Sequence, residues 1–166
     1  MKKAPTVTFA DFLNSFPEVD LPIVLTEDAQ AVFSKENTPL TKIMVEQFIV
    51  PMDNEIDEFT EYVPCCRIPK TYDFHAIVLW KGGLMNYEYF LITFDKKGNL
   101  IEKKMIAGTQ VKGDSLLRTV ATIEEDWTIA SVVGVASAKD ALAYDPATTL
   151  DSTLELLPDG KIINIT

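Results

Sequence analysis

The sequence is poor in histidine, in cysteine and in positive charge. Its 166 residues include one His, two Cys and 15 Lys or Arg against 25 Asp or Glu, so the formal net charge is −10 at pH 7. Binding to nucleic acid needs a concentrated positive field, which this composition argues against. A single His and one pair of cysteines are also a poor ligand set for a structural zinc site. We therefore expect no nucleic-acid partner, no metal and no cofactor.

Long apolar runs are missing as well. No stretch approaches the ~18 residues of a membrane-spanning helix, and the longest, such as residues 76–80, have the length of a strand. Two lysines follow Met1, but residues 4–8 do not form the apolar core of a secretory signal. These patterns predict a cytoplasmic protein without a membrane span. The alternative of a surface or periplasmic protein whose leader was removed stays open.

The two cysteines, Cys65 and Cys66, are neighbours in the chain. A disulfide between adjacent residues would close a strained ring, far from the usual separation of bridged residues, and disulfides are rare in the cytosol. On an extended segment the two side chains would point to opposite faces. We predict two unpaired thiols, with a redox switch as the less favoured alternative.

The first 64 residues favour short helices. In residues 8–16, four apolar side chains recur at helical spacing, and Thr8 is a suitable N-cap with Asp11 three residues later. Residues 21–25 are expected to be extended, and residues 27–34 to form a turn or two of helix. A second longer helix is predicted to open at Thr38-Pro39, because Pro is favoured at the first helical position.

From Cys65 onward the apolar period changes to two, which predicts strands joined by tight turns. Strands linked in this way form an antiparallel sheet. The expected fold class is therefore α+β, a single domain over 1–166 with short N-terminal helices (1–64) followed by an antiparallel β-sheet of hairpins (65–166). The expected strands cover 75–80, 87–94, 100–106, 117–123, 127–135, 153–157 and 162–165, and the longest expected loop covers 136–151.

Charge divides along the same line. Residues 1–64 hold 4 basic and 12 acidic residues (net −8), and residues 65–166 hold 11 and 13 (net −2). Such a field steers a basic protein partner toward the N-terminal part, whereas the plainer alternative is that these carboxylates only keep the protein soluble. The acidic segment 53–61 lacks the turn glycine and the Asp spacing of a calcium loop. The densest candidate binding residues are Asp53, Glu55, Asp57, Glu58 and Glu61.

Aromatic residues gather around the first expected hairpin, where Trp80, Tyr87 and Tyr89 are the second set of candidate binding residues. Tyr87 and Tyr89 share one face of their strand, opposite the face of Phe90 and Phe94. The second face looks like core. The first face is either an exposed binding surface, where Tyr and Trp are enriched, or a layer covered by the N-terminal helices.

Catalytic patterns are weak. The only imidazole, His75, lies two residues after Asp73, so the two side chains share a strand face, but no Gly-x-Ser-x-Gly elbow is present. We therefore expect no enzyme but a binding protein. An inhibitor or immunity-type protein that masks a basic protein is one form of it. The alternative is an enzyme or small-ligand carrier with a pocket near His75 and the cysteines. The oligomeric state is left open.

Residues 87–108, with Phe-Asp-Lys-Lys-Gly at 94–98, resemble a hairpin of a group of small bacterial antiparallel-sheet proteins. Phe12-Leu13 with Phe16-Pro17, the Leu21-Pro22 pair and the closing Leu-Pro-Asp-Gly-Lys-Ile at 157–162 are similar to segments of the same group. The resemblance implies an antiparallel sheet. Members are often secreted or lipid-anchored, and the group offers no activity to carry over.

Overall fold

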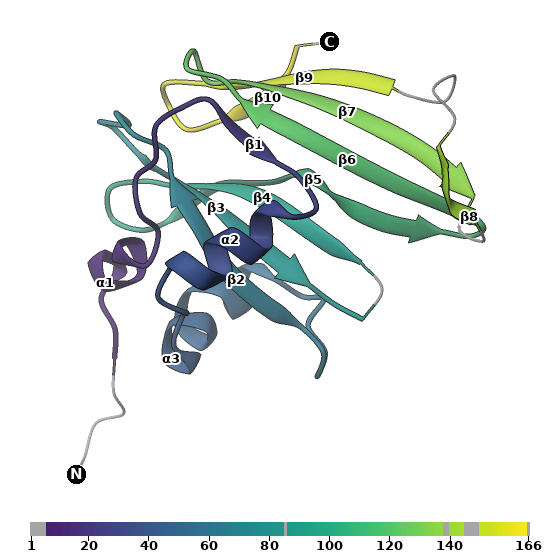
Figure 1. Cartoon of the computed structure of the whole chain (residues 1–166). Coiled ribbons are helices and arrows are strands. Elements are labelled where there is room, and N and C mark those ends of the chain that lie inside the picture. The colour runs from purple at the N-terminus through teal and green to yellow at the C-terminus, as the bar shows by residue number, and fades with distance from the viewer. Residues whose placement is uncertain (1–5, 85, 138–139, 145–149, 166) are drawn as a thin grey trace.

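The computed structural model describes residues 6–84, 86–137, 140–144 and 150–165 (Figure 1). Strands take up 45% and helices 17%, so the protein is mostly antiparallel sheet with few helices, which fits an α+β class. The helices are α1 (Phe9–Asn14), α2 (Ala29–Glu36), α3 (Lys42–Met44), the π-helix η1 (Val45–Ile49) and the 3₁₀-helix η2 (Val50–Met52). The strands are β1 (Ile23–Leu25), β2 (Glu61–Arg67), β3 (His75–Gly82), β4 (Tyr87–Phe94), β5 (Leu100–Lys112), β6 (Ser115–Ile123), β7 (Thr128–Ser137), β8 (Asp140–Tyr144), β9 (Leu150–Leu156) and β10 (Ile162–Asn164).

The strands follow the order β10-β9-β7-β6-β5-β4-β3-β2, with β1 added beside β6 and β8 beside β7. Every one of these neighbouring pairs is antiparallel. The expectation of helices first and sheet afterwards is wrong in one respect. β1 lies between α1 and α2 in the chain and pairs with β6, so Leu25 is opposite Ala121. An early strand is thus built into a late part of the sheet.

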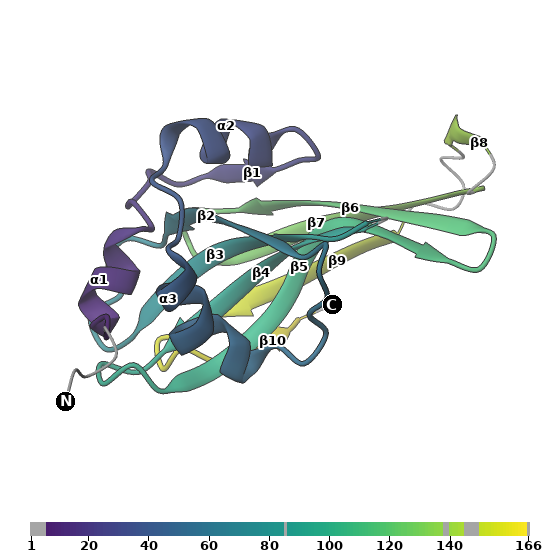
Figure 2. The ribbon, with the colours of Figure 1, turned by 90° about the horizontal axis from the view of Figure 1, so that it is seen from below.

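β5 connects the two halves of the sheet by changing partners along its length. It pairs with β4 from Leu100 to Thr109 and with β6 from Gly108 to Lys112. Gly108 has a positive φ of 148°, and a Cβ built there would lie 2.4 Å from the carbonyl oxygen of Tyr87. Glycine is therefore required where β4, β5 and β6 come together. Figure 2 shows the end of β5 running out together with β6 and β7, past β2, β3 and β4.

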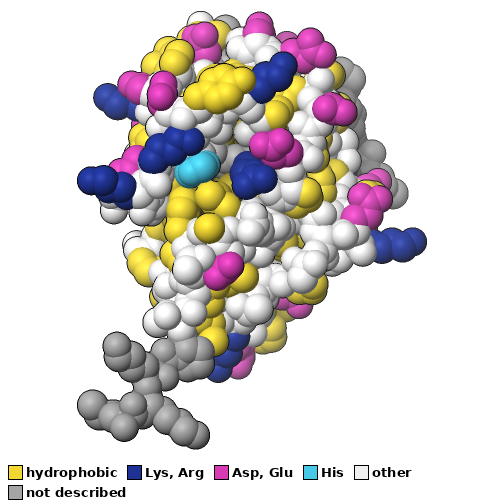
Figure 3. Space-filling model, turned by 90° about the vertical axis from the view of Figure 1, so that its left-hand side faces the viewer, with side chains coloured by type: hydrophobic (Ala, Val, Ile, Leu, Met, Phe, Trp, Pro, Cys, Tyr) yellow, Lys and Arg dark blue, Asp and Glu magenta, His cyan; other side chains and the backbone are white. Residues whose placement is uncertain are grey.

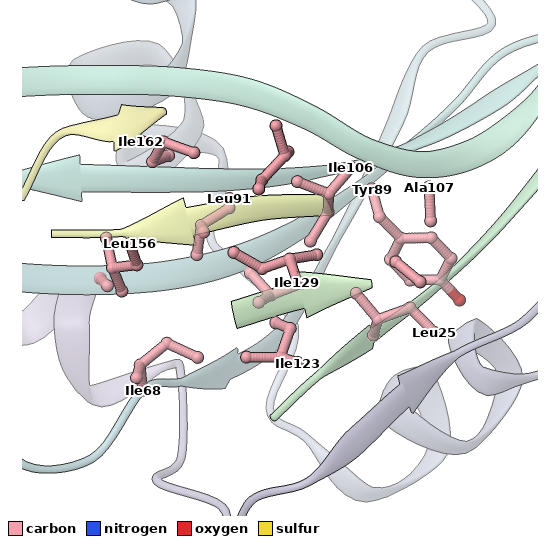
Figure 4. Packing of buried hydrophobic residues seen from close by; sticks show 14 of the residues in the cluster. Leu25, Ile68, Tyr89, Leu91, Ile106, Ala107, Ile123, Ile129, Leu156 and Ile162 are labelled. Atoms are coloured by element: carbon pink, nitrogen blue, oxygen red, sulfur yellow. The ribbon is translucent and has the colours of Figure 1, made fainter. Parts of the chain in front are cut away.

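The larger of two cores lies between the two halves (Figure 4). Side chains of β3 and β4 on one side meet side chains of β6, β7, β9 and β10 on the other, with Leu25 of β1 between them. Tyr89 is fully buried here, and its hydroxyl donates to the carbonyl oxygen of Thr26 at 2.8 Å. Phe33 of α2 packs against this core too. The face of Tyr89 is therefore an interior one that α2 and β1 help to cover.

The second core covers the opposite face of β3 and β4. Phe12, Leu13 and Phe16 of α1 and its C-terminal end, together with Ile49 of η1, are buried against this face. Thr8 caps α1 as predicted: its hydroxyl accepts from the Asp11 amide, and the Asp11 carboxylate accepts from the Thr8 amide. The residues that β3 and β4 contribute are Ile77, Leu79, Ile92 and Phe94.

Several boundaries differ from the sequence-based expectations. The second longer helix begins at Lys42, because the Thr41 hydroxyl, rather than that of Thr38, accepts from the first-turn amide of Met44. β2 was not predicted, since Pro64 and a bulge between Pro64 and Cys66 interrupt its alternation. β8 occupies part of the expected 136–151 loop, of which residues 138–139 and 145–149 lie outside the described residues.

Within the described part of the chain, no helix has both the length and the apolar character to cross a membrane.

Gly108→Ala should destabilise the fold strongly, because it combines a disfavoured backbone conformation with a clash against β4. We expect the free energy of unfolding in a urea titration to fall by about 3 kcal/mol. Gly113→Ala is the matched control. Its φ is also positive (60°) but its Cβ would meet open space, so it should cost about 1 kcal/mol. Equal losses in the two variants would contradict the role given to Gly108.

Candidate functional site

The acidic segment 53–61 is fastened to the sheet by a buried ion pair. Asp53 and Lys81 are each only 8% exposed. The Lys81 ammonium lies 2.8 Å from Oδ2 and 3.0 Å from Oδ1 of Asp53, and it also donates to the carbonyl oxygen of Glu55 at 2.9 Å. The hydroxyl of Tyr62 donates to Oδ2 of Asp53 at 2.5 Å. Tyr62 of β2 and Lys81 of β3 thus meet at one carboxylate, and Lys81 also holds the backbone of the segment.

These contacts keep Asp53 ionised. Burial acts to raise its pKa, but the hydrogen bonds from Lys81 and Tyr62 outweigh that effect and hold the pKa of Asp53 below its usual value. Burial, together with the hydrogen bond to Asp53, raises the pKa of Tyr62. Lys103 reinforces the arrangement by donating to the carbonyl oxygen of Met52 at 3.1 Å. Asp53 is therefore an internal anchor and not part of the exposed acidic surface.

The other four predicted acidic residues, Glu55, Asp57, Glu58 and Glu61, are exposed. Asp57 also shapes the segment, because its Oδ1 accepts from the amide of Phe59 at 2.8 Å. Phe59 (51% exposed) and Ile56 (41% exposed) display apolar side chains between these carboxylates. The segment thus presents negative charge and apolar surface together, in a conformation tied to the sheet.

A groove of about 470 Å³ separates this segment from the end of α2 and from α3. Its apolar lining comes from Ile56 of the acidic segment, Val63 of β2, and Leu40 and Val45. Glu61 and Lys42 add charged groups to the lining. The remaining lining residues are Ser34, Asn37, Pro39, Thr60, Tyr62 and Pro64. This is an open, mainly apolar channel with a few polar groups, the composition typical of binding sites.

The predicted aromatic residues do not join this groove. The Trp80 ring lies over Gly82, where a Cβ would come within 2.1 Å of it, and stacks on Tyr87 with 6.2 Å between ring centroids. Trp80 and Tyr87 are half-buried and pack against the larger core, while Tyr89 is inside it. The alternative of an exposed aromatic binding surface is therefore wrong for Tyr89, because β1 and α2 cover that side of the hairpin.

His75 is the centre of the alternative site, and the structure places it at the start of β3. His75 is half-buried at the start of β3, with its ring 5.9 Å from that of Phe9, and Figure 3 shows it at a surface that also carries Lys and Arg side chains. Burial and the positive charges of Lys96 and Arg67 lower its pKa. His75, Asp73 and the cysteines do not line any of five well-formed cavities among the described residues.

Both cysteine thiols are free and fully buried in the larger core. The expectation that they point to opposite faces is wrong, because the bulge between Pro64 and Cys66 lets both side chains reach the same core. Burial raises the pKa of Cys66 to about 12 and that of Cys65 well above its usual value. The register places Cys66 opposite Val78. Val78 is three residues from His75, so the two positions lie about 10 Å apart along β3.

Among the described residues, no three His, Cys, Asp or Glu side chains converge in a way that could hold a metal ion. Comparisons with protein-family models, with curated proteins and with solved structures found no match to this chain.

Sequence reasoning missed Lys81, Tyr62 and the groove. Lys81 carried a usable signal, because a lysine at the end of an otherwise apolar strand needs a carboxylate partner if it is buried. Its partner, 28 residues earlier, could not be identified from spacing. The groove had no signal, since its walls come from three separate segments.

Lys81→Met should leave the Asp53 carboxylate buried without its cation. At pH 7 we expect the free energy of unfolding to fall by about 3–5 kcal/mol in a urea titration. Because the native pKa of Asp53 is lowered, the pairing contributes fully above pH 3.8 and is lost as the pH falls through the native pKa. The difference in the free energy of unfolding between wild type and variant should therefore become smaller below pH 3.8. A gap independent of pH would contradict the ion pair as its cause.

The thiols should be inert in the folded protein. At pH 8 a chromogenic disulfide reagent should react with neither cysteine of the native chain, because both stay protonated and buried. In guanidinium chloride the two should react within minutes. Rapid labelling of a native thiol would instead support the redox-switch alternative.

Proposed function

We propose that this protein is a non-enzymatic binding protein whose acidic face docks a basic protein. An inhibitor or immunity-type protein, which masks the basic surface of a toxin or enzyme, is the form of this function that suits the chain best. The observation that carries the proposal is the segment 53–61. It holds Glu55, Asp57, Glu58 and Glu61 together with exposed Ile56 and Phe59, on a backbone anchored by a buried ion pair.

The fixed position of these carboxylates favours a role in recognition over a role in solubility alone. Carboxylates that serve solubility alone need no fixed position, whereas here a buried Asp and a buried Lys hold the acidic segment against the sheet. Fixing a loop before binding reduces the entropy lost on association. Negative charge then accelerates encounter with a positive partner, and the apolar side chains among the carboxylates supply surface to bury.

The chain should retain a basic protein from a native lysate of its source at low salt, and the capture should weaken as salt is raised. The triple variant Glu55→Gln/Glu58→Gln/Glu61→Gln should retain about tenfold less of it, taking about 0.5 kcal/mol for each lost charge pair.

The control variant Glu102→Gln/Glu125→Gln/Glu155→Gln also removes three charges, but from the β-rich part, and should bind as the wild type does. Mass spectrometry of the retained fraction identifies the partner. If both triple variants lose capture equally, net charge rather than this face is responsible; if no basic protein is retained, the proposed function is wrong.

A further inference from the structure

β2 is the last strand on its side of the sheet, and its outer edge is covered only in part. At its C-terminal end, the amide of Arg67 donates to the carbonyl oxygen of Pro17 at 2.9 Å. In the middle, the Asn37 side-chain amide donates to the carbonyl oxygens of Pro64 (2.7 Å) and Cys65 (2.8 Å). Along Glu61–Val63, no segment among the described residues pairs with this edge.

An open strand edge is a template for another strand, and proteins commonly cover or charge such edges. Here the covering stops where the groove begins. Val63 belongs to both features, because it lies on the open part of β2 and lines the groove beside it. A backbone paired with Glu61–Val63 would place every second side chain toward Leu40, Val45 and Ile56, which suits apolar residues.

The charge around the groove specifies the occupant further. Residues 34–64 hold seven carboxylates and two lysines, a net charge of −5. Lys81 neutralises Asp53, and Lys42 pairs with Glu46 at 3.8 Å. The uncompensated charges are therefore almost all negative, which favours a basic segment and opposes a second copy of this chain, whose own net charge is −10.

We infer that an extended basic segment of the partner protein lies in this groove and pairs with β2 as an added strand. This rests on the proposed function and specifies how the partner is held. Alternate apolar side chains of the segment enter the groove, and its Lys or Arg side chains lie on the other face of the added strand, beside Glu61. The backbone bonds supply affinity, while the groove and the charges select the sequence.

The test uses two labelled peptides and the full chain. One alternates lysine with valine and isoleucine (Ac-KVKIKVK-NH₂), and the other replaces each lysine by glutamate. In fluorescence anisotropy at low salt, the basic peptide should bind at least about tenfold more tightly than the acidic one, and salt should weaken it. On binding, hydrogen exchange should slow at the amides of Glu61–Val63. No saturable binding of the basic peptide, or equal binding of both, overturns the proposal.

Ile56→Ala should weaken the basic peptide about fivefold, because it removes one apolar wall of the groove. Ile163→Ala is the matched control: Ile163 is 39% exposed on β10 at the other end of the sheet, against 41% for Ile56, so neither change should disturb folding. An unchanged affinity for Ile56→Ala, or a dimer of the chain that this variant dissolves, overturns the proposal.

The two proposals fail in different ways. If a captured basic protein still binds the Ile56→Ala variant fully, and exchange at Glu61–Val63 stays fast in its complex, the strand pairing is wrong while the binding function stands. If no basic protein is captured at all, the function itself is wrong.

Discussion

The contact between Lys81 and Asp53 is the constraint on which the acidic face depends. A charge taken out of water needs a partner, so Asp53 can be buried only where Lys81 meets it, and the segment that follows has to start from that point. Tyr62 and the carbonyl oxygen of Glu55 complete the set. Ile56 of this segment lines the groove together with Leu40, and a free loop would leave only a changing surface there.

The sheet prepares this arrangement by burying β3 and β4 on both faces. The β6–β7 half with β1 and α2 covers one face, and α1 with η1 covers the other. Because β3 is thus held rigidly, Lys81 near its end is a fixed point. β2 lies outside β3 as the last strand of the sheet. Its outer edge is open wherever Asn37 and the rest of the N-terminal part do not cover it.

Charge and shape act at the same place. Most of the excess negative charge lies in residues 1–64, and the groove is bordered by residues of that part together with the start of β2. The surface around His75, in contrast, carries Lys and Arg side chains interspersed with Asp and Glu (Figure 3). The negative charge is therefore distributed unevenly along the chain.

Local patterns in the sequence determined the capped first helix, the hairpins from β3 onward and the acidic character of residues 53–61, because capping, alternation and charge each involve neighbours in the chain. The tertiary structure alone decided three things. It buried Asp53 and left the other acidic residues exposed, since Lys81 is distant in sequence. It placed Tyr89 inside, because β1 returns to pair with β6. It formed β2, whose Pro64 and bulge hide the alternation, and with it the open edge and groove.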